Sequence, residues 1–162
     1  MRGSNNPEQE IANAKYPKIR LFHIPKKAST FPERDCNASW KECSPESVAN
    51  FSAVAYYFGR HLQSELNVPI GLVGTAWGGT RIEPWTPIPG FDAVDNLRSI
   101  ADKVRRFSDL DLIVDRAQRW ADAVKAAVQN GRRIPSPPQV PKLNHGNPTG
   151  LYNGMIAPVV PY

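Results

Sequence analysis

Residues 74–78, Gly74-Thr75-Ala76-Trp77-Gly78, have a spacing that is used in catalysis. They read as G-x-A-x-G, which is the nucleophile elbow G-x-S-x-G with Ala76 in place of the reactive serine. An inactive hydrolase of the α/β-hydrolase fold is one interpretation, but no serine elsewhere in the chain sits in an elbow. The stretch matches neither the dinucleotide fingerprint nor the Gly-Lys-Ser or Gly-Lys-Thr ending of a phosphate loop.

The neighbouring glycines, Gly78 and Gly79, can do chemistry through the backbone alone. Glycines at the end of a parallel strand adopt positive φ without strain and let a ligand approach the main chain closely. Their N–H groups can then donate to an oxyanion, and one such donor contributes roughly 3 to 4 kcal/mol to acyl transfer. The alternative is a tight turn beneath Trp77 and Trp85, and the loop alone leaves both interpretations open.

A β-α-β unit is expected to position this loop. The sequence predicts a short helix from Asn6 to about Ala14 and then a strand over residues 18–24, which lie between two prolines. A long helix is predicted over 44–66, followed by an apolar strand over 70–76 that has the pattern of a strand buried on both faces. The apolar face of the long helix comprises Val48, Phe51, Val54, Ala55, Phe58, Leu62 and Leu66.

The rest of the chain divides where its composition changes. Residues 1–90 hold the β-α-β core with the glycine loop, and residues 91–130 read as a helical insertion of two amphipathic helices that meet near Ser108. Residues 131–162 read as a proline-rich crossover that leads into a further, truncated strand. Two strands with apolar faces cannot satisfy their own edges or cover both sides of a sheet. The sequence therefore predicts an incomplete piece of a larger sheet.

Two shorter segments are predicted to be irregular. Residues 28–42 are polar and are expected to form an excursion on the surface. The proline-laden stretch that contains Pro84, Pro87 and Pro89 is expected to be a loop at the carboxyl end of a strand, without regular structure.

Charge and hydropathy exclude several classes of protein. The chain has 20 Lys and Arg residues and 15 Asp and Glu residues, which gives a formal charge of +5. The basic residues between 102 and 133 are interspersed with aspartates, a pattern typical of solvated helix faces, and no nucleic-acid motif accompanies them. No apolar run is long enough to cross a bilayer. We therefore expect no nucleic-acid or membrane partner, and a basic nucleic-acid module is the weakest functional hypothesis.

The cysteines and histidines do not form a metal-binding pattern. Cys36 and Cys43 suit neither a C-x-x-C redox pair nor a zinc knuckle, and both a local disulfide and two free thiols remain open. His23, His61 and His145 lie in separate predicted elements, so we assign them structural roles. No metal site and no cofactor are expected.

Long segments of the chain resemble one known family. The segment FSAVAYYFGRHLQSELNVPIGLVGTAWGGTRIEPWTP looks like the corresponding part of the sialate O-acetylesterases, a branch of the SGNH hydrolases that removes acetyl esters from sugars. The similarity extends to NNPEQEIANAKYPKIRLFHIP and CSPESVANFSAVAYYFGR upstream and to LYNGMIAPVVPY downstream. It covers nearly all of the chain except residues 91–141.

The resemblance implies an α/β fold and a set of catalytic blocks. The implied fold is a three-layer α/β/α sandwich with a flavodoxin-like parallel sheet, here incomplete and with a helical insertion. In the family, Gly-Gln-Ser-Asn supplies the serine nucleophile, Gln-Gly-Glu-Ser-Asn gives further oxyanion contacts, and Asp-x-x-His supplies the base and its partner. None of these three blocks occurs in the 162 residues, so the chain resembles a middle portion of the domain. The resemblance matches the family's oxyanion glycine to Gly78 or Gly79, and Ala76 then replaces nothing.

Two main functional hypotheses follow. In the first, the chain is part of a carbohydrate O-acetylesterase and supplies the oxyanion-hole glycine loop, although it lacks the catalytic serine, aspartate and histidine blocks and is not expected to turn over alone. Candidate substrate contacts are Trp77, Arg81, Glu83, Trp85 and Asn153. In the second, the chain is a noncatalytic carbohydrate-binding domain with tryptophan platforms at Trp40, Trp77, Trp85 or Trp120.

The expected partners are an acetylated sugar or glycan and the remainder of the same catalytic domain. An acetyl xylan esterase-like activity is an alternative to activity on sialic acid. The resemblance suggests that the full-length protein is secreted or periplasmic, although the N-terminus MRGSNNPEQE lacks the regions of a signal peptide.

Overall fold

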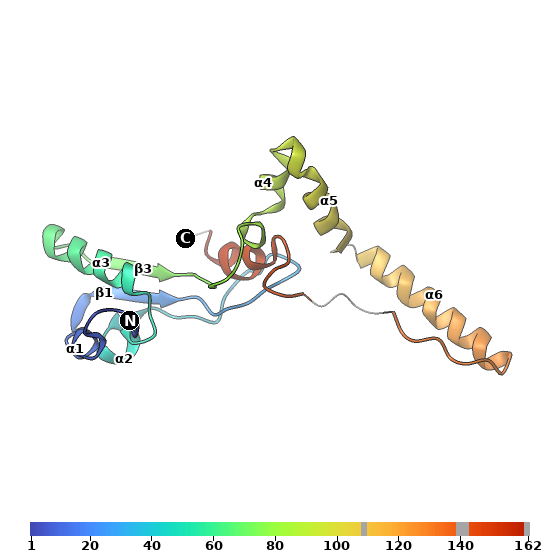
Figure 1. The fold of residues 1–162 in the computed structure, drawn as a ribbon, viewed down its shortest axis with the longest axis horizontal. Coiled ribbons are helices and arrows are strands. Elements are labelled where there is room, and N and C mark those ends of the chain that lie inside the picture. Colours follow the sequence, from blue (N-terminus) through green and yellow to red (C-terminus); the bar gives the residue numbers. More distant parts are fainter. Residues whose placement is uncertain (108–109, 139–142, 161–162) are drawn as a thin grey trace. The chain divides into compact units, whose positions relative to one another are not determined.

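The computed structural model describes residues 1–107, 110–138 and 143–160 and has a mixed α/β fold (Figure 1). The described residues form two compact units. The first unit consists of Met1–Lys26, Arg34–Gly79 and Pro158–Tyr162, and the second consists of Lys27–Glu33 and Thr80–Ala157. The predicted junction near Ser108 lies outside the described residues.

The first unit is built on a three-stranded sheet with the order β2-β1-β3. Strand β1 (Tyr16–His23) pairs in parallel with β3 (Ile70–Gly74) and antiparallel with β2 (Lys41–Cys43). The parallel pair with a helix between its strands confirms the predicted β-α-β unit. Strand β2 is an addition, because the whole of 28–42 was expected to be an irregular excursion and a three-residue strand gives little periodic signal.

Three helices accompany the sheet, and the predicted long helix is interrupted. Helix α1 (Pro7–Ala12) precedes β1, and the span from 44 to 66 divides into α2 (Pro45–Val48) and α3 (Ala53–Leu66). The break occurs at Ser52, which has an extended backbone and accepts a hydrogen bond at its hydroxyl from the Ala55 N–H, 3.3 Å away. This N-cap starts a new helix and changes which side chains share a face.

The face of α3 that packs on the sheet differs from the prediction. Tyr56 and Gly59 are its buried residues. Val54, Phe58 and Leu66, which were expected in the core, are 82%, 61% and 60% exposed. The prediction assumed one continuous helix from residue 44. Because the helix is interrupted before Ser52, the residues of α3 that face the sheet are not those that a continuous helix would place there.

The core of the first unit lies between α3 and one face of the sheet. Alternate β1 side chains, Ile19 and Leu21, point into it because successive residues of a strand face opposite sides. Its other buried members are Met1, Ala14, Cys43, Val48, Phe51, Tyr56 and Leu72. On the opposite face Val73 is 48% exposed. The expectation that β3 is buried on both faces is therefore wrong for this structure, because Leu72 is the one buried residue of the strand.

The second unit is helical in its described part. It contains η1 (Glu83–Trp85), α4 (Ile88–Asp92), η2 (Asp95–Leu97), α5 (Arg98–Phe107) and α6 (Leu110–Gln129). Helices α5 and α6 lie where two amphipathic helices were predicted, and their status as an insertion stays a prediction. The short helices η1 and α4 lie where irregular structure was expected, because each has a proline in its first turn, where the missing N–H costs no helical hydrogen bond.

The segment after residue 150 is helical rather than extended. Its residues form the π-helical turn η3 (Tyr152–Ile156) and then η4 (Ala157–Val159). The prediction of a truncated strand here is therefore wrong for the described residues up to 160. An apolar run of this length does not distinguish a strand from a buried helical turn.

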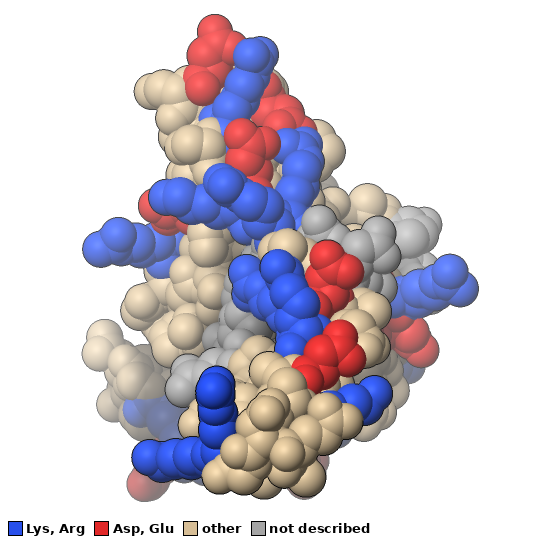
Figure 2. Space-filling view, turned by 90° about the vertical axis from the view of Figure 1, so that its right-hand side faces the viewer, with Lys and Arg blue, Asp and Glu red and all other residues tan. Residues whose placement is uncertain are grey.

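Charged residues on the second unit form local pairs. Arg105 contacts the carboxylates of Asp92 and Asp102, and Arg98 contacts that of Asp95. The side chain of Asp92 raises the pKa of Arg105. Figure 2 shows blue and red side chains interspersed on the displayed face, as predicted for solvated helices. In the part of the chain that the structure describes, no helix is both long and apolar enough to cross a membrane.

Candidate oxyanion loop

The glycine loop begins where the two parallel strands end. His23 lies opposite Gly74 in the register of β1 and β3, and both are the last residues of their strands. The Ile24 N–H donates to the Gly74 carbonyl at 3.0 Å, which extends the pairing by one step. Carboxyl ends of parallel strands are the usual position of ligand crevices in α/β proteins. The chain then enters the segment Thr75 to Gly79.

The two glycines of this loop have open surroundings. Gly79 has a φ of 80°, and an ideal Cβ at either Gly78 or Gly79 would have no heavy atom within 4 Å. Both residues are exposed. Among the described residues, neither N–H donates a hydrogen bond to a backbone carbonyl. The loop thus presents two backbone donors with space around them, which is the requirement for stabilising an oxyanion.

Trp77, in the same loop, is held by a cation–π contact. The Lys26 Nζ lies 5.6 Å from the centroid of the Trp77 ring. Lys26 follows the end of β1 and Trp77 follows the end of β3. The contact therefore joins the two segments that leave the sheet, and it places a positive charge at the ring that was predicted to stack on a sugar.

The next predicted site residues belong to the second unit. The Trp85 Nε1 donates to the Thr80 Oγ1 at 2.9 Å, so the polar edge of this indole is already satisfied within the unit. Arg81 is exposed. Trp85 is partly buried in η1. Their roles as sugar contacts stay predictions.

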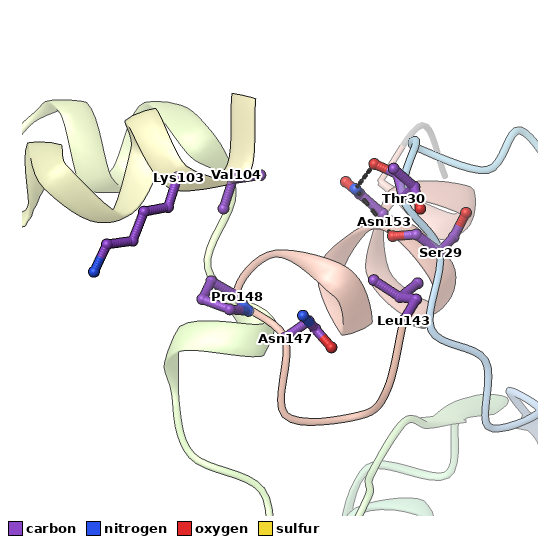
Figure 3. A pocket seen from close by; sticks show the side chains of 8 residues that line it. All are labelled: Ser29, Thr30, Lys103, Val104, Leu143, Asn147, Pro148 and Asn153. Atoms are coloured by element: carbon purple, nitrogen blue, oxygen red, sulfur yellow. Dashed lines mark hydrogen bonds between the residues drawn. The ribbon is translucent and has the colours of Figure 1, made fainter. Parts of the chain in front are cut away.

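Glu83 and Asn153 are joined through the backbone of Thr149. The Glu83 carbonyl accepts from the Thr149 N–H at 3.0 Å, and the Asn153 N–H donates to the Thr149 carbonyl at 2.9 Å. Asn153 is 4% exposed, and its side-chain amide donates to the Ser29 and Thr30 carbonyls at 3.3 and 2.9 Å (Figure 3). This amide therefore holds the segment at 29–30, beside a cavity of about 250 Å³.

The two other candidate platforms also have intramolecular partners. Trp40 packs against Phe22 with ring centroids 5.1 Å apart, and its ring lies about where a side chain at Gly71 would be. The Trp120 Nε1 donates to the Pro135 carbonyl at 3.0 Å. Trp40 is nevertheless 52% exposed. The roles of both indoles as sugar platforms stay predictions.

A second hollow lies at the strand ends, and sequence reasoning missed it. It measures about 420 Å³, and its lining includes His23, Asn50, Ser52 and Thr75. The Thr75 hydroxyl is buried and has no hydrogen-bond partner in the structure. Thr75 lies inside the predicted strand over 70–76 and directly after the observed end of β3, so its position at the strand end was not indicated by the sequence. The polar residues around it come from segments far apart in the sequence.

Neither a metal centre nor an activated thiol is found among the residues described. No three His, Cys, Asp or Glu side chains of the described ranges gather closely enough to hold a metal ion. Cys36 and Cys43 are both free. Burial, and next the charge of Glu42, raise the pKa of the Cys43 thiol to about 11. A thiol with so high a pKa is protonated near neutrality and is a poor nucleophile.

Comparison with known proteins connects the chain to one kind of enzyme. Over 90 residues it is 33% identical to the sialate O-acetylesterases of Pongo abelii and Homo sapiens and 36% identical to that of Mus musculus. Each alignment covers 50% of this chain and 17% of the relative. No protein-family model matches the chain.

A solved structure extends the likeness to almost the whole chain. A carbohydrate acetylesterase from Xanthomonas citri, described as novel, superposes with a TM-score of 0.63 at 25% sequence identity. The superposition covers 98% of this chain and 26% of that protein. The resemblance to the sialate O-acetylesterases inferred from the sequence is therefore confirmed. The chain spans 26% of the length of the solved acetylesterase, and its alignment with the sialate O-acetylesterases covers 17% of theirs.

Proposed function

From these likenesses, we propose that the 162 residues are part of a carbohydrate O-acetylesterase domain and supply its oxyanion loop. The observation that carries the proposal is the pair of open glycines, Gly78 and Gly79, at the carboxyl end of a parallel strand. Their free N–H groups are suited to a developing negative charge, and a donor of this kind needs no side chain.

In the proposed reaction, a serine from the remainder of the domain attacks the acetyl carbonyl of the sugar ester. The carbonyl oxygen becomes an oxyanion, and a glycine N–H of this chain donates to it. The C–O bond to the sugar then breaks, and the sugar oxygen takes the proton that a general base removed from the serine. Water hydrolyses the acetyl-serine, so that acetate leaves with the base regenerated. In this proposal, Trp77 and Arg81 contact the sugar.

Uncovered apolar surface supports the proposal that the domain is larger than this chain. Val54, Phe58 and Leu66 recur at steps of four or eight and form an exposed apolar stripe on α3. On the opposite side of the sheet, a hollow of about 520 Å³ is lined mainly by apolar side chains, including Phe22 and Val73. Continuous exposed apolar surface marks an interface.

The occupant that we propose for these surfaces is the remainder of the same domain. The solved acetylesterase has 74% of its length outside the superposition, since the match covers 26%. Further parallel strands beside β3 and a helical layer on the open face would complete a three-layer α/β/α sandwich with a flavodoxin-like sheet. Both layers of apolar side chains would then be buried.

The test is a hybrid acetylesterase, in which this chain replaces the matching segment of the Xanthomonas citri enzyme. The hybrid is expected to release acetate from an acetylated sugar, whereas the 162-residue chain alone releases none. Cooperative thermal unfolding of the hybrid is measured first as a control for folding. A folded hybrid without acetyl release, beside an active parent enzyme, would contradict the proposal.

A further inference from the structure

We propose that Asn153 is a positioning residue of the esterase, which holds the two loops that follow β1 and β3 and does not touch the substrate. The inference rests on the proposed function for the reaction that these loops serve. Residues 27–33 are called the β1 exit loop, and residues 80–86, which follow the glycine loop, are called the β3 exit loop. Both loops and Asn153 belong to the second unit.

The side chain of Asn153 is attached to the β1 exit loop. Asn153 is 4% exposed, and its amide nitrogen donates to the carbonyls of Ser29 and Thr30 at 3.3 and 2.9 Å (Figure 3). The backbone carbonyl of Asn153 accepts from the Glu33 N–H at 2.9 Å. An amide nitrogen carries two hydrogens. Because both have carbonyl partners within the protein, neither is left to donate to a substrate.

The turn that carries this side chain makes further attachments to the same loop. The Ser29 N–H donates to the Gly150 carbonyl at 2.9 Å. An ideal Cβ on Gly154 would overlap the carbonyl oxygen of Lys27, so the close approach of the two backbones requires glycine at this position. Lys27 and Glu33 form an ion pair at 2.8 Å, which joins the two ends of the β1 exit loop.

The same turn holds the β3 exit loop through Thr149. Its N–H donates to the Glu83 carbonyl at 3.0 Å, and its carbonyl accepts from the Asn153 N–H at 2.9 Å. Thr149 is 2% exposed and has a φ of 65°. A β-branched residue adopts this left-handed conformation at a cost in energy, so its contacts must hold it there. Glu83 lies four positions after Gly79, and this bond therefore anchors the chain just behind the glycine loop.

These contacts attach both exit loops to one buried turn. Loops at the carboxyl ends of parallel strands usually form the ligand crevice of an α/β protein. An oxyanion donor loses much of its effect when it is displaced by about 1 Å. Loss of the Asn153 amide would free the β1 exit loop and loosen the turn that anchors the β3 exit loop. We therefore expect it to reduce stabilisation of the transition state rather than affinity for the sugar.

The first experiment compares hydrogen exchange in the 162-residue chain and in its Asn153→Ala variant, and it needs no enzymatic activity. Mass spectrometry follows peptides that contain the amides of Ser29, Glu33 and Thr149. Exchange at all three is expected to be roughly tenfold faster in the variant, because two hydrogen bonds that hold the turn are lost.

Asn130→Ala is the matched control. The amide of Asn130 also donates to a backbone carbonyl, that of Ala126 at 2.7 Å, but it lies at the exposed end of α6. Its removal is expected to leave exchange at Ser29, Glu33 and Thr149 unchanged.

The second experiment measures kcat and KM of the hybrid acetylesterase with each substitution. Asn153→Ala is expected to lower kcat roughly tenfold and to leave KM for an acetylated sugar within about twofold, because a positioning residue acts on the transition state. A side chain that binds the sugar directly would instead raise KM. Asn130→Ala is expected to leave both constants unchanged. If Asn153→Ala does not fold, Asn153→Ser, which keeps one donor, replaces it and should change kcat in the same direction.

Four results would overturn the proposal. They are unchanged exchange in Asn153→Ala, faster exchange at Ser29 and Glu33 without a change at Thr149, an unchanged kcat in the folded hybrid variant, and an equal loss of kcat in Asn130→Ala. A raised KM with kcat preserved is the third of these and would assign Asn153 to substrate binding. A folded hybrid that releases no acetate before substitution would contradict the proposed function, and the exchange measurement would still decide whether Asn153 holds both loops.

Discussion

Lys26 lies over the indole ring of Trp77, with its Nζ 5.6 Å from the ring centroid. The lysine belongs to the segment after β1 and the tryptophan to the loop after β3. Gly78 and Gly79 follow Trp77 directly, so this contact lies at the start of the glycine loop. It joins two residues that are separated by 51 positions in the sequence, and no local pattern identifies the pair.

Replacing Lys26 with methionine is predicted to loosen this contact. The variant Lys26→Met keeps an unbranched side chain of similar length but removes the charge, so the free energy of unfolding should fall by about 0.5 to 1 kcal/mol. The ¹⁵N indole resonance of Trp77 is expected to move as well. Lys26→Arg, which keeps a cation over the ring, is the control and should preserve both values. An unchanged Trp77 resonance in Lys26→Met would show that the contact does not form in solution.

The contact between Gly59 and Leu72 predicts that Gly59→Ala destabilises the native sequence but stabilises the Leu72→Val variant. An ideal Cβ on Gly59 would lie 2.7 Å from the Leu72 Cδ1, which is closer than packing allows. Gly59→Ala is therefore expected to lower the free energy of unfolding by about 1 kcal/mol, because overpacking exceeds the gain in helix propensity.

In the Leu72→Val background the clashing methyl groups are absent. There Gly59→Ala is expected to raise the free energy of unfolding, by up to about 1 kcal/mol. Urea denaturation of the four proteins measures the coupling. Equal effects of Gly59→Ala in both backgrounds are incompatible with the packing described.

Cys43 predicts a loss of stability at alkaline pH. Burial raises the pKa of its thiol to about 11 in the folded chain, whereas a thiol in the unfolded chain titrates near pH 8.5. Between these values the folded state binds more protons than the unfolded state, so the free energy of unfolding decreases as pH rises.

Urea denaturation at about pH 8 and about pH 10 tests this prediction. The decrease is expected to reach on the order of 2 kcal/mol in the native sequence and to be largely absent from Cys43→Ala. The variant is less stable at both pH values because it leaves a cavity. A decrease of the same size in Cys43→Ala would assign the pH dependence to other groups.

Polar substitutions in the exposed apolar stripe of α3 are predicted to affect this chain and the hybrid acetylesterase differently. Phe58→Gln with Leu66→Gln is expected to change the free energy of unfolding of this chain by less than about 0.5 kcal/mol, because both side chains are mostly exposed. Self-association in sedimentation velocity should decrease. In the hybrid acetylesterase the same substitutions should destabilise the fold, since the stripe is covered there. Leu72→Gln, at a buried position, is the control and should destabilise both proteins. Equal tolerance in both proteins argues against a covering layer.

Much of the first unit follows from sequence patterns. Pro17 and the apolar residues after it indicated β1, and the apolar run from Ile70 indicated β3, because periodicity and proline placement are local signals. The residues of α3 that face the sheet could not be predicted in this way. It depends on the cap at Ser52, and the sequence before it continues the helical pattern without a clear interruption.

The candidate site was only partly accessible from sequence. Gly78 and Gly79 could be selected because paired glycines after a buried strand are a local signal. The bonds of Asn153 to the carbonyls of Ser29 and Thr30 could not, since they join segments more than 120 positions apart. The hollow around Thr75 was missed for the same reason.

Two glycines provide a matched test of backbone donation by the glycine loop. Gly79 and Gly131 have φ values of 80° and 60°, and neither has a heavy atom within 4 Å of an ideal Cβ. Gly79→Ala and Gly131→Ala therefore impose a similar backbone strain of about 1 to 2 kcal/mol, but only the first alters the loop.

The decisive measurement is kcat/KM for acetyl release from an acetylated sugar by the hybrid acetylesterase carrying each substitution. We expect Gly79→Ala to lower it roughly 100-fold, because a displaced donor no longer meets the oxyanion. Gly131→Ala should leave it within about twofold of the unmodified hybrid, as a surface substitution far along the chain normally does. Equal kcat/KM values for the two folded variants would contradict the assignment of the oxyanion donor to this loop.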